Sequence, residues 1–71
     1  MSDGKLSVTV NGEARQFPEG TTLGDLLESL ALAVEGVAVA INLEVVPRGG
    51  IASRALRQGD RVELVRAVGG G

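Results

Sequence analysis

The sequence contains no cysteine, no histidine and only one aromatic residue, Phe17. Without cysteine, the chain has no disulfide, no thiolate nucleophile and no cysteine-based metal site. Without histidine, it lacks the side chain that most often acts as a general base at neutral pH and as a metal ligand. A chain of 71 residues builds only a thin core, which leaves no room for an aromatic-lined substrate pocket. We therefore predict that the chain is not an enzyme and that it binds no metal or cofactor.

An excess of charge of one sign is also missing. Seven basic and nine acidic residues give a net charge of −2, without the basic cluster of a nucleic-acid-binding protein. Residues 1–5 are polar and contain no apolar signal core. No segment approaches the roughly 18 apolar residues of a membrane span. We expect a cytoplasmic protein with neither nucleic acid nor a membrane as a partner.

Near the N-terminus the pattern indicates a β-hairpin. Residues 6–10 alternate between apolar and polar side chains, as in a half-buried strand. Asn11-Gly12 follows at once, and this dipeptide favours a type I′ turn because both residues tolerate positive φ. A second strand is predicted over residues 13–17, ended by Pro18, which lacks a backbone donor.

A helix follows the hairpin. Thr22 and Asp25 have the spacing of a capping box at its start. The helix is expected to end near residues 31–32, with a loop at 35–36. Its apolar face has the i, i+3, i+4, i+7 spacing, and consists of Leu23, Leu26, Leu27 and Leu30.

The second half of the chain indicates three more strands. Residues 37–41 are apolar on both faces, which is typical of a strand inside a sheet or covered on its second face. In the last strand, Val62 and Leu64 are expected to face inward. We predict strands at 37–41, 45–46 and 61–67, tight turns at 42–44 and 58–60, and one helical turn over 53–56.

These elements predict an α+β fold. A single amphipathic helix buries its leucine face only against a sheet, and the first and last strands are expected to lie side by side beneath it. The prediction is a ubiquitin-like β-grasp fold, a mixed sheet of four to five strands packed on one main helix. Residues 1–68 would form the domain and residues 69–71 a flexible glycine tail.

The tail Gly69-Gly70-Gly71 has competing explanations. A frayed terminus or a cloning scar explains a glycine run about as well as a function does. Glycine has no Cβ, however, so such a tail fits a channel that other residues would block, and residues 68–71 span at most about 14 Å. The terminal carboxylate is ionised at neutral pH and must be activated by a partner. This reasoning favours a tail that presents Gly71 to another protein's active site.

Six segments follow one another in order over about residues 5–71. They are Val10-Asn11-Gly12-Glu13, Thr22-Leu23-Gly24-Asp25-Leu26-Leu27, Val39-Ala40-Ile41-Asn42, Val45-Val46-Pro47-Arg48, Gly59-Asp60-Arg61-Val62-Glu63-Leu64 and Gly70-Gly71. Together they resemble the ThiS/MoaD family of ubiquitin-like sulfur carriers. The third glycine of the tail, Gly69, departs from the usual terminal pair, and Leu43 stands where a glycine or polar residue is expected.

The resemblance implies a cycle that other proteins catalyse. An E1-like enzyme would use ATP to adenylate the carboxylate of Gly71. Sulfur, supplied by a cysteine desulfurase or a related source, would then displace AMP and leave a thiocarboxylate. Thiazole synthase would take this sulfur into the thiazole ring of thiamine.

Three alternatives stay open beside the thiamine pathway. One shares the mechanism, namely a sulfur carrier of the molybdopterin synthase type. The second belongs to another class and is a ubiquitin-like protein modifier joined through Gly71 to lysine amines. The third is a purely structural adaptor. The short length and the segment Val45-Val46-Pro47-Arg48 favour the thiamine pathway.

Four residues are predicted as a possible partner interface: Leu43, Val65, Arg66 and Val68. By strand alternation Val65 belongs to the outer sheet face, where it would form a flat apolar patch with Ala38 and Ala40. A solvated surface explains the arginines of the second half better than a docking site does. These arginines are Arg48, Arg54, Arg57, Arg61 and Arg66.

Overall fold

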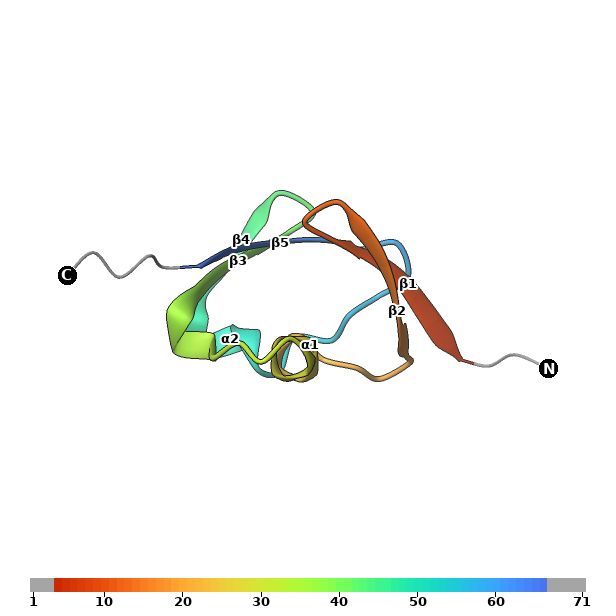
Figure 1. Cartoon of the computed structure of the whole chain (residues 1–71), viewed down its shortest axis with the longest axis horizontal. Helices are drawn as coiled ribbons and strands as arrows, with labels where there is room; N and C mark the ends of the chain where they lie inside the picture. The colour runs from red at the N-terminus through yellow and green to blue at the C-terminus, as the bar shows by residue number, and fades with distance from the viewer. Residues whose placement is uncertain (1–3, 67–71) are drawn as a thin grey trace.

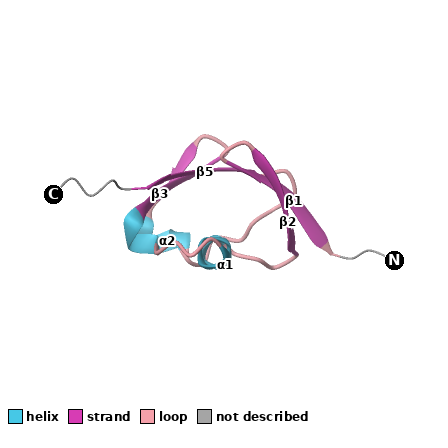
Figure 2. Cartoon of the chain, viewed as in Figure 1, coloured by secondary structure: helices cyan, strands magenta, loops and turns pink. Residues whose placement is uncertain are grey.

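The structure, a computed structural model, describes residues 4–66. In this part of the chain, the strands form one sheet in the order β2-β1-β5-β3-β4, and both α-helices lie on the same side of it (Figures 1 and 2). The sheet is mixed, because β1 and β5 are parallel whereas the other pairs are antiparallel. The predicted β-grasp fold is confirmed. Its elements are β1 (Lys5–Val10), β2 (Glu13–Pro18), α1 (Leu23–Ser29), the 3-10 helix η1 (Val34–Gly36), β3 (Val37–Ile41), β4 (Glu44–Val46), α2 (Arg48–Ile51) and β5 (Arg61–Arg66).

The β1–β2 hairpin forms as the sequence predicts. Asn11 and Gly12 have φ values of 51° and 87°, which are the positive values that a type I′ turn requires at both central residues. The pairing runs from Lys5↔Pro18 to Val10↔Glu13. This register places the apolar alternation of β1 on the side of the sheet that carries the helices.

The core lies between the sheet and the helices. Leu23 and Leu26 of α1 are completely buried, as is Val62 of β5, and burial of each such side chain contributes about 1.5–3 kcal/mol. The remaining buried apolar residues are Leu6, Val8, Val10, Leu27, Val37, Val39, Ile41, Ile51, Leu56 and Leu64.

Helix α1 has the predicted start but an earlier end. The Thr22 hydroxyl accepts a hydrogen bond from the Asp25 N–H, and the Asp25 carboxylate accepts one from the Thr22 N–H, both at 3.1 Å. The helix ends at Ser29 because Ala31 adopts φ 60°. The Ala31 N–H then bonds to the Glu28 carbonyl and the Leu32 N–H to the Leu27 carbonyl. This is a Schellman termination with alanine in the position that usually holds glycine.

Gly24 allows helix α1 to pack closely on the backbone of Ala52, although glycine is a poor helix former. A Cβ at this position would lie 2.8 Å from the carbonyl oxygen of Ala52 and 3.1 Å from its Cα. Helix propensity alone predicts that Gly24→Ala stabilises the protein by about 1 kcal/mol. We expect instead a loss of about 1–3 kcal/mol, because the backbone of residue 52 must move away.

Urea unfolding of Gly24→Ala measures this loss. Glu28→Ala, a substitution at an exposed position of the same helix, is the control and is expected to change the free energy of unfolding by less than about 0.5 kcal/mol. A Gly24→Ala variant more stable than the wild type would show that the helix does not pack closely on residue 52.

The helical turn predicted over residues 53–56 is wrong, and α2 forms earlier, at Arg48–Ile51. Pro47 precedes it with φ −59°, a value already suited to a helix start, and Ile51 is buried in the core. Residues 54–56 are extended instead, because they pair with the chain that leads into α1. The Leu23 N–H donates to the Arg54 carbonyl, and the Leu56 N–H donates to the Thr21 carbonyl.

The last three strands, β3, β4 and β5, are adjacent in the sheet. β3 lies between β4 and β5, as expected for a strand with two apolar faces. The turn after β3 has two central residues, Asn42 and Leu43, with φ values of 52° and 72°. The predicted strand end at residue 67 and the predicted boundary between domain and tail lie outside the described residues.

Candidate functional site

The structural base of the candidate site is β5, which leads into the glycine tail. Arg66 is its last residue and also the last that the structure describes. β5 lies inside the sheet, with β1 on one side and β3 on the other. The predicted site residues Val68, Gly69, Gly70 and Gly71 lie outside the described residues. Residues 67–71 span at most about 17 Å, so a protein that receives Gly71 must contact the surface around the end of β5.

The outer face of the sheet, opposite the helices, carries an apolar patch near this end. Val65 pairs with Ala38 across β5 and β3, and Ala40 pairs with Val45 across β3 and β4. Val65 is 65% exposed and Val45 is 80% exposed. These four residues, Ala38, Ala40, Val45 and Val65, line one open hollow together with Val39 and Glu63. We call them the apolar patch.

Leu43 lies in the β3–β4 turn and is 77% exposed. A leucine with φ 72° is unusual, because the left-handed region costs residues other than glycine about 1–2 kcal/mol. The backbone of Leu43 is therefore strained, and its exposed side chain does not contribute to the core. Such strain at an exposed apolar residue is the kind of feature found at binding surfaces.

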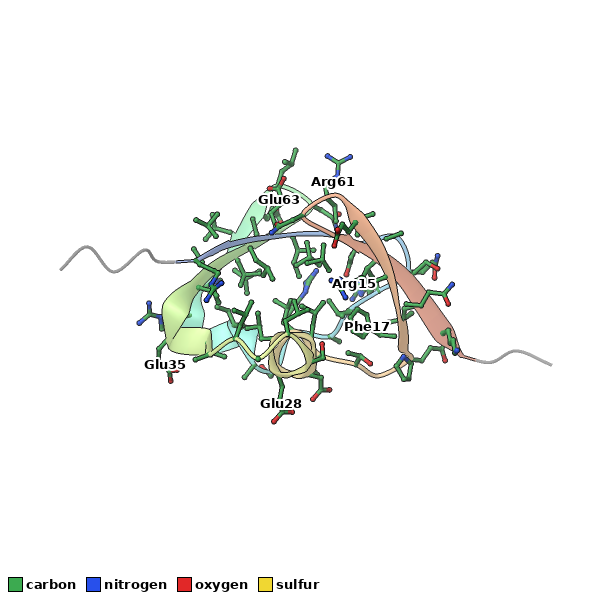
Figure 3. All side chains as sticks on the ribbon, viewed as in Figure 1. Arg15, Phe17, Glu28, Glu35, Arg61 and Glu63 are labelled. Carbon is green, nitrogen blue, oxygen red and sulfur yellow. The ribbon has the colours of Figure 1, made fainter. Side chains whose placement is uncertain are left out.

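The other half of the outer face is polar. Arg61 and Glu63 of β5 project from the sheet on the side opposite α1, whereas Phe17 lies on the helix side (Figure 3). Ser7 and Thr9 of β1 continue this polar half towards β2. The outer face thus changes from polar to apolar along β5, with Glu63 between the two halves.

The predicted interface residues do not all lie together. Leu43 and Val65 are both exposed, and Val65 belongs to the outer face as predicted. Arg66 follows the alternation of Val62 and Leu64 to the helix side, where it borders a groove with Leu30 and Leu32. The arginines are spread over α2, both ends of β5 and the chain between them. This distribution is typical of a solvated surface.

Val45 is the patch residue that the sequence reasoning missed. A turn of three residues, 42–44, gives no register for the strand that follows. A type I′ turn with Asn42 and Leu43 as its two central residues places Ile41 opposite Glu44 and Ala40 opposite Val45. The asparagine at the first turn position was the available signal, because asparagine tolerates the positive φ of such turns.

Residues 4–66 contain no group of three or more side chains that could hold a metal ion. Among these same residues, no helix is long and apolar enough to cross a membrane. The described structure presents a strand that is paired on both sides and an apolar patch beside it.

Fold and surface together define a small ubiquitin-like β-grasp protein. The sequence model of the ThiS family matches residues 8–71. The chain belongs to the ThiS family, as its resemblance predicted. The crystal structure of the thiamine biosynthesis protein ThiS from Geobacter metallireducens superposes with a TM-score of 0.71 at 33% identity, covering 93% of this chain and 100% of that one.

Two curated relatives represent two kinds of match. The sulfur carrier protein ThiS of Escherichia coli K12 is 35% identical over 66 residues, which are 93% of this chain and 100% of that protein. The thiazole synthase of Paramagnetospirillum magneticum is 39% identical over 66 residues, again 93% of this chain. The chain spans only 20% of the length of that synthase.

Proposed function

We propose that this chain is a sulfur carrier of thiamine biosynthesis and that Gly71 is the residue that bears the sulfur. The proposal rests on the position of β5 in this chain, which belongs to the ThiS family. This strand is paired on both sides and leads within a few residues into Gly69-Gly70-Gly71. It provides a firm base from which a narrow tail can enter another protein.

The chemistry proceeds in two displacements at the Gly71 carboxyl group. A carboxylate oxygen attacks the α-phosphorus of ATP, and pyrophosphate leaves. The terminal sulfur of a persulfide on the donor then attacks the carbonyl carbon of the acyl adenylate, and AMP leaves with the original oxygen. A thiol reduces the S–S bond of the resulting acyl disulfide, which releases the thiocarboxylate and leaves a disulfide on the donor. The net change is one oxygen replaced by one sulfur. An E1-like enzyme catalyses the first step, and a cysteine desulfurase or related source supplies the sulfur.

In this scheme the chain acts as a substrate and shuttle and catalyses nothing itself. Neither step requires a thiol or an imidazole from the carrier, and the sequence contains neither. ATP and the sulfur donor are bound by partner enzymes. The contribution of the chain is to hold the tail and to be recognised.

Thiazole synthase is the proposed recipient of the sulfur. Two thiazole synthases contain a stretch of 66 residues that is 39–41% identical to this chain and makes up 20% of their length. Covalent linkage of two domains gives each a high effective concentration at the other. A carrier-like stretch within a synthase chain therefore supports a direct encounter between the two activities.

Partners are proposed to bind over the apolar patch and Leu43. The patch is within reach of any protein that holds the tail, and its exposed valines can be buried without unfolding the core. Leu43 is proposed as a further contact, in the β3–β4 turn, which lies beside the start of β5 because Ile41 pairs with Val62. Val68 and Arg66 complete the proposed interface, with Arg66 contacting a partner from the helix side.

The strain at Leu43 predicts that replacing this residue raises stability but weakens binding to a partner. Leu43→Gly removes about 1–2 kcal/mol of backbone strain but adds about 0.5–1 kcal/mol of unfolded-state entropy. We expect the free energy of unfolding to rise by about 0.5–1 kcal/mol in urea titrations. Binding to thiazole synthase is expected to weaken about tenfold, because a partly buried leucine is lost from the interface.

Leu43→Asn is the matched control for this prediction, since asparagine tolerates positive φ but is polar. It should share the gain in stability and the loss in affinity. If both variants bind thiazole synthase as tightly as the wild type in calorimetric titrations, Leu43 does not belong to the interface.

A sulfur-transfer experiment tests the proposed function. The chain is prepared with isotopically labelled sulfur in a thiocarboxylate at Gly71 and is mixed with thiazole synthase and its other substrates. The label is expected in the thiazole product. Product formed without label, or label found on lysines of other proteins, would favour a different role, such as that of a protein modifier. Transfer into molybdopterin would favour the other sulfur-carrier pathway.

A further inference from the structure

β5 has a shorter pairing with β1, on one of its sides, than with β3, on the other. Within residues 4–66, β1 pairs with β5 only at Thr9↔Arg61 and Val10↔Val62, whereas β5 continues to Arg66. β1 stops because the chain reverses at Asn11. On the other side, β3 remains paired with β5 as far as Val37↔Arg66.

Asn11 continues the parallel ladder with its side chain. The Thr9 N–H donates to the Asp60 carbonyl at 3.0 Å, and two residues later the Asn11 N–H donates to the Val62 carbonyl at 2.8 Å. In a continued parallel ladder, the carbonyl of Asn11 would next accept the Leu64 N–H. Here the Asn11 Oδ1 accepts it, at 2.8 Å.

The amide nitrogen of the same side chain makes the bond that follows. Asn11 Nδ2 donates to the Leu64 carbonyl at 3.2 Å, in place of the next N–H that a longer β1 would supply. One asparagine thus satisfies both backbone groups of Leu64 on this side. Asparagine meets both needs, because it tolerates the φ of 51° and carries an acceptor and a donor on one group.

Asn42 repeats the arrangement at the other end of β5. It also holds the first position of a type I′ turn, with φ 52°. Its N–H donates to the Arg61 carbonyl at 2.9 Å, its Oδ1 accepts the Arg61 N–H at 3.0 Å, and its Nδ2 donates to Asp60 Oδ1 at 3.1 Å. Two hairpin asparagines therefore hold β5, one at its start and one near the tail.

We propose that Asn11 is a positioning residue for the tail, an inference that rests on the sulfur-carrier function proposed above. By holding Leu64, it keeps the last residues of β5 in the sheet and so fixes the point from which the tail leaves. Without it, residues 64–66 are paired only with β3. A partner enzyme must then order this segment when it binds the tail, and each backbone residue that becomes ordered costs binding free energy. Asn42 has no such effect, because it acts at the start of the strand.

Hydrogen exchange provides the first test. In Asn11→Gly the amide of Leu64 is expected to lose protection about tenfold or more, with the amide of Arg61 unchanged. In Asn42→Gly the pattern is expected to reverse. Glycine is the chosen replacement at both sites because it accepts the positive φ without strain. Unchanged protection of Leu64 in Asn11→Gly would overturn the inference.

Adenylation kinetics provide the second test. With the E1-like enzyme, Asn11→Gly is expected to raise the KM for the chain about tenfold with kcat within about twofold, since ordering is needed for binding and not for chemistry. Asn42→Gly loses the same number of side-chain bonds and is expected to leave KM within about twofold. This difference between two variants of similar stability separates positioning from a general loss of structure.

Asn11→Asp is the second variant, which serves if Asn11→Gly does not fold. It keeps the acceptor for the Leu64 N–H but sets a carboxylate oxygen against the Leu64 carbonyl, so KM should rise as in the glycine variant. Equal KM values for the Asn11 and Asn42 variants, while the wild type reacts, would contradict the positioning role alone. A wild-type chain that is not adenylated at all would contradict the proposed function and with it this role.

Discussion

Deletion of Gly70 and Gly71 is expected to abolish thiocarboxylate formation while leaving the fold unchanged. The chain would then end at the first glycine of the tail, with its carboxylate about 7 Å closer to the body. An adenylating site at the end of a narrow channel would no longer be reached. The expected loss in kcat/KM is at least about a thousandfold, because a reacting group out of position loses most of the advantage of a bound geometry.

A matched deletion at the other end provides the control. Removal of Met1 and Ser2 shortens the chain by the same number of residues and is expected to leave the reaction rate within about twofold, because neither residue belongs to the tail or to the proposed interface. Deletion of one glycine is an informative intermediate, since it leaves the terminal glycine pair that the family resemblance implied. Mass spectrometry of the C-terminus measures all three chains. Full activity after loss of both glycines would exclude Gly71 as the site.

Placing a charge in the apolar patch is the second change with a large expected effect. Val65→Asp puts a carboxylate at a position that is 65% exposed in the free protein and proposed to be desolvated in the complex. Burial of an unpaired charge costs several kcal/mol. Binding to thiazole synthase and to the E1-like enzyme is therefore expected to weaken about a hundredfold or more, as measured by calorimetric titration.

Gln16→Asp is the control for the same charge on the polar half of the outer face. Gln16 of β2 lies opposite Ser7 of β1 and is exposed. Both variants therefore add one carboxylate at an exposed strand position. Unfolding in urea should show similar, small losses for the two. Equal affinities of the Val65 and Gln16 variants would mean that the apolar patch is not the binding surface.

The elements that the sequence predicted well are those with a local physical cause. Asn11-Gly12 defines a turn by its tolerance of positive φ, and Thr22 with Asp25 defines a helix start by hydrogen bonds three residues apart. The alternation of Val62 and Leu64 decides which face of the last strand is buried. Each of these signals acts over a few residues, so no knowledge of the distant chain is required.

The features that sequence reasoning missed depend on contacts between distant segments. α2 forms at residues 48–51, and residues 54–56 stay extended because they pair with the chain before α1. The early end of α1 was missed for a local reason, because alanine occupies a left-handed position that usually holds glycine. For the candidate site, Val65 was placed correctly by parity, whereas Val45 needed the register of the β3–β4 turn.

The hydrogen bonds between the Asn11 side chain and Leu64 could not be predicted from the sequence either. Asn11 was recognised as a turn residue, which explains its backbone but not its side chain. Its second role becomes visible only when β5 lies beside β1, because its partner is 53 positions away in the sequence. A residue that satisfies a local and a distant requirement cannot be fully interpreted from local pattern alone.

The central claim is that Gly71 carries the sulfur, and intact-mass analysis tests it most directly. The chain is incubated with the E1-like enzyme, ATP and a sulfur donor, and its C-terminal fragment is then sequenced by mass spectrometry. The proposal predicts a mass gain equal to the exchange of one oxygen for one sulfur, located at Gly71 and dependent on ATP. An unchanged mass under these conditions, or a modification on any other residue, would contradict it.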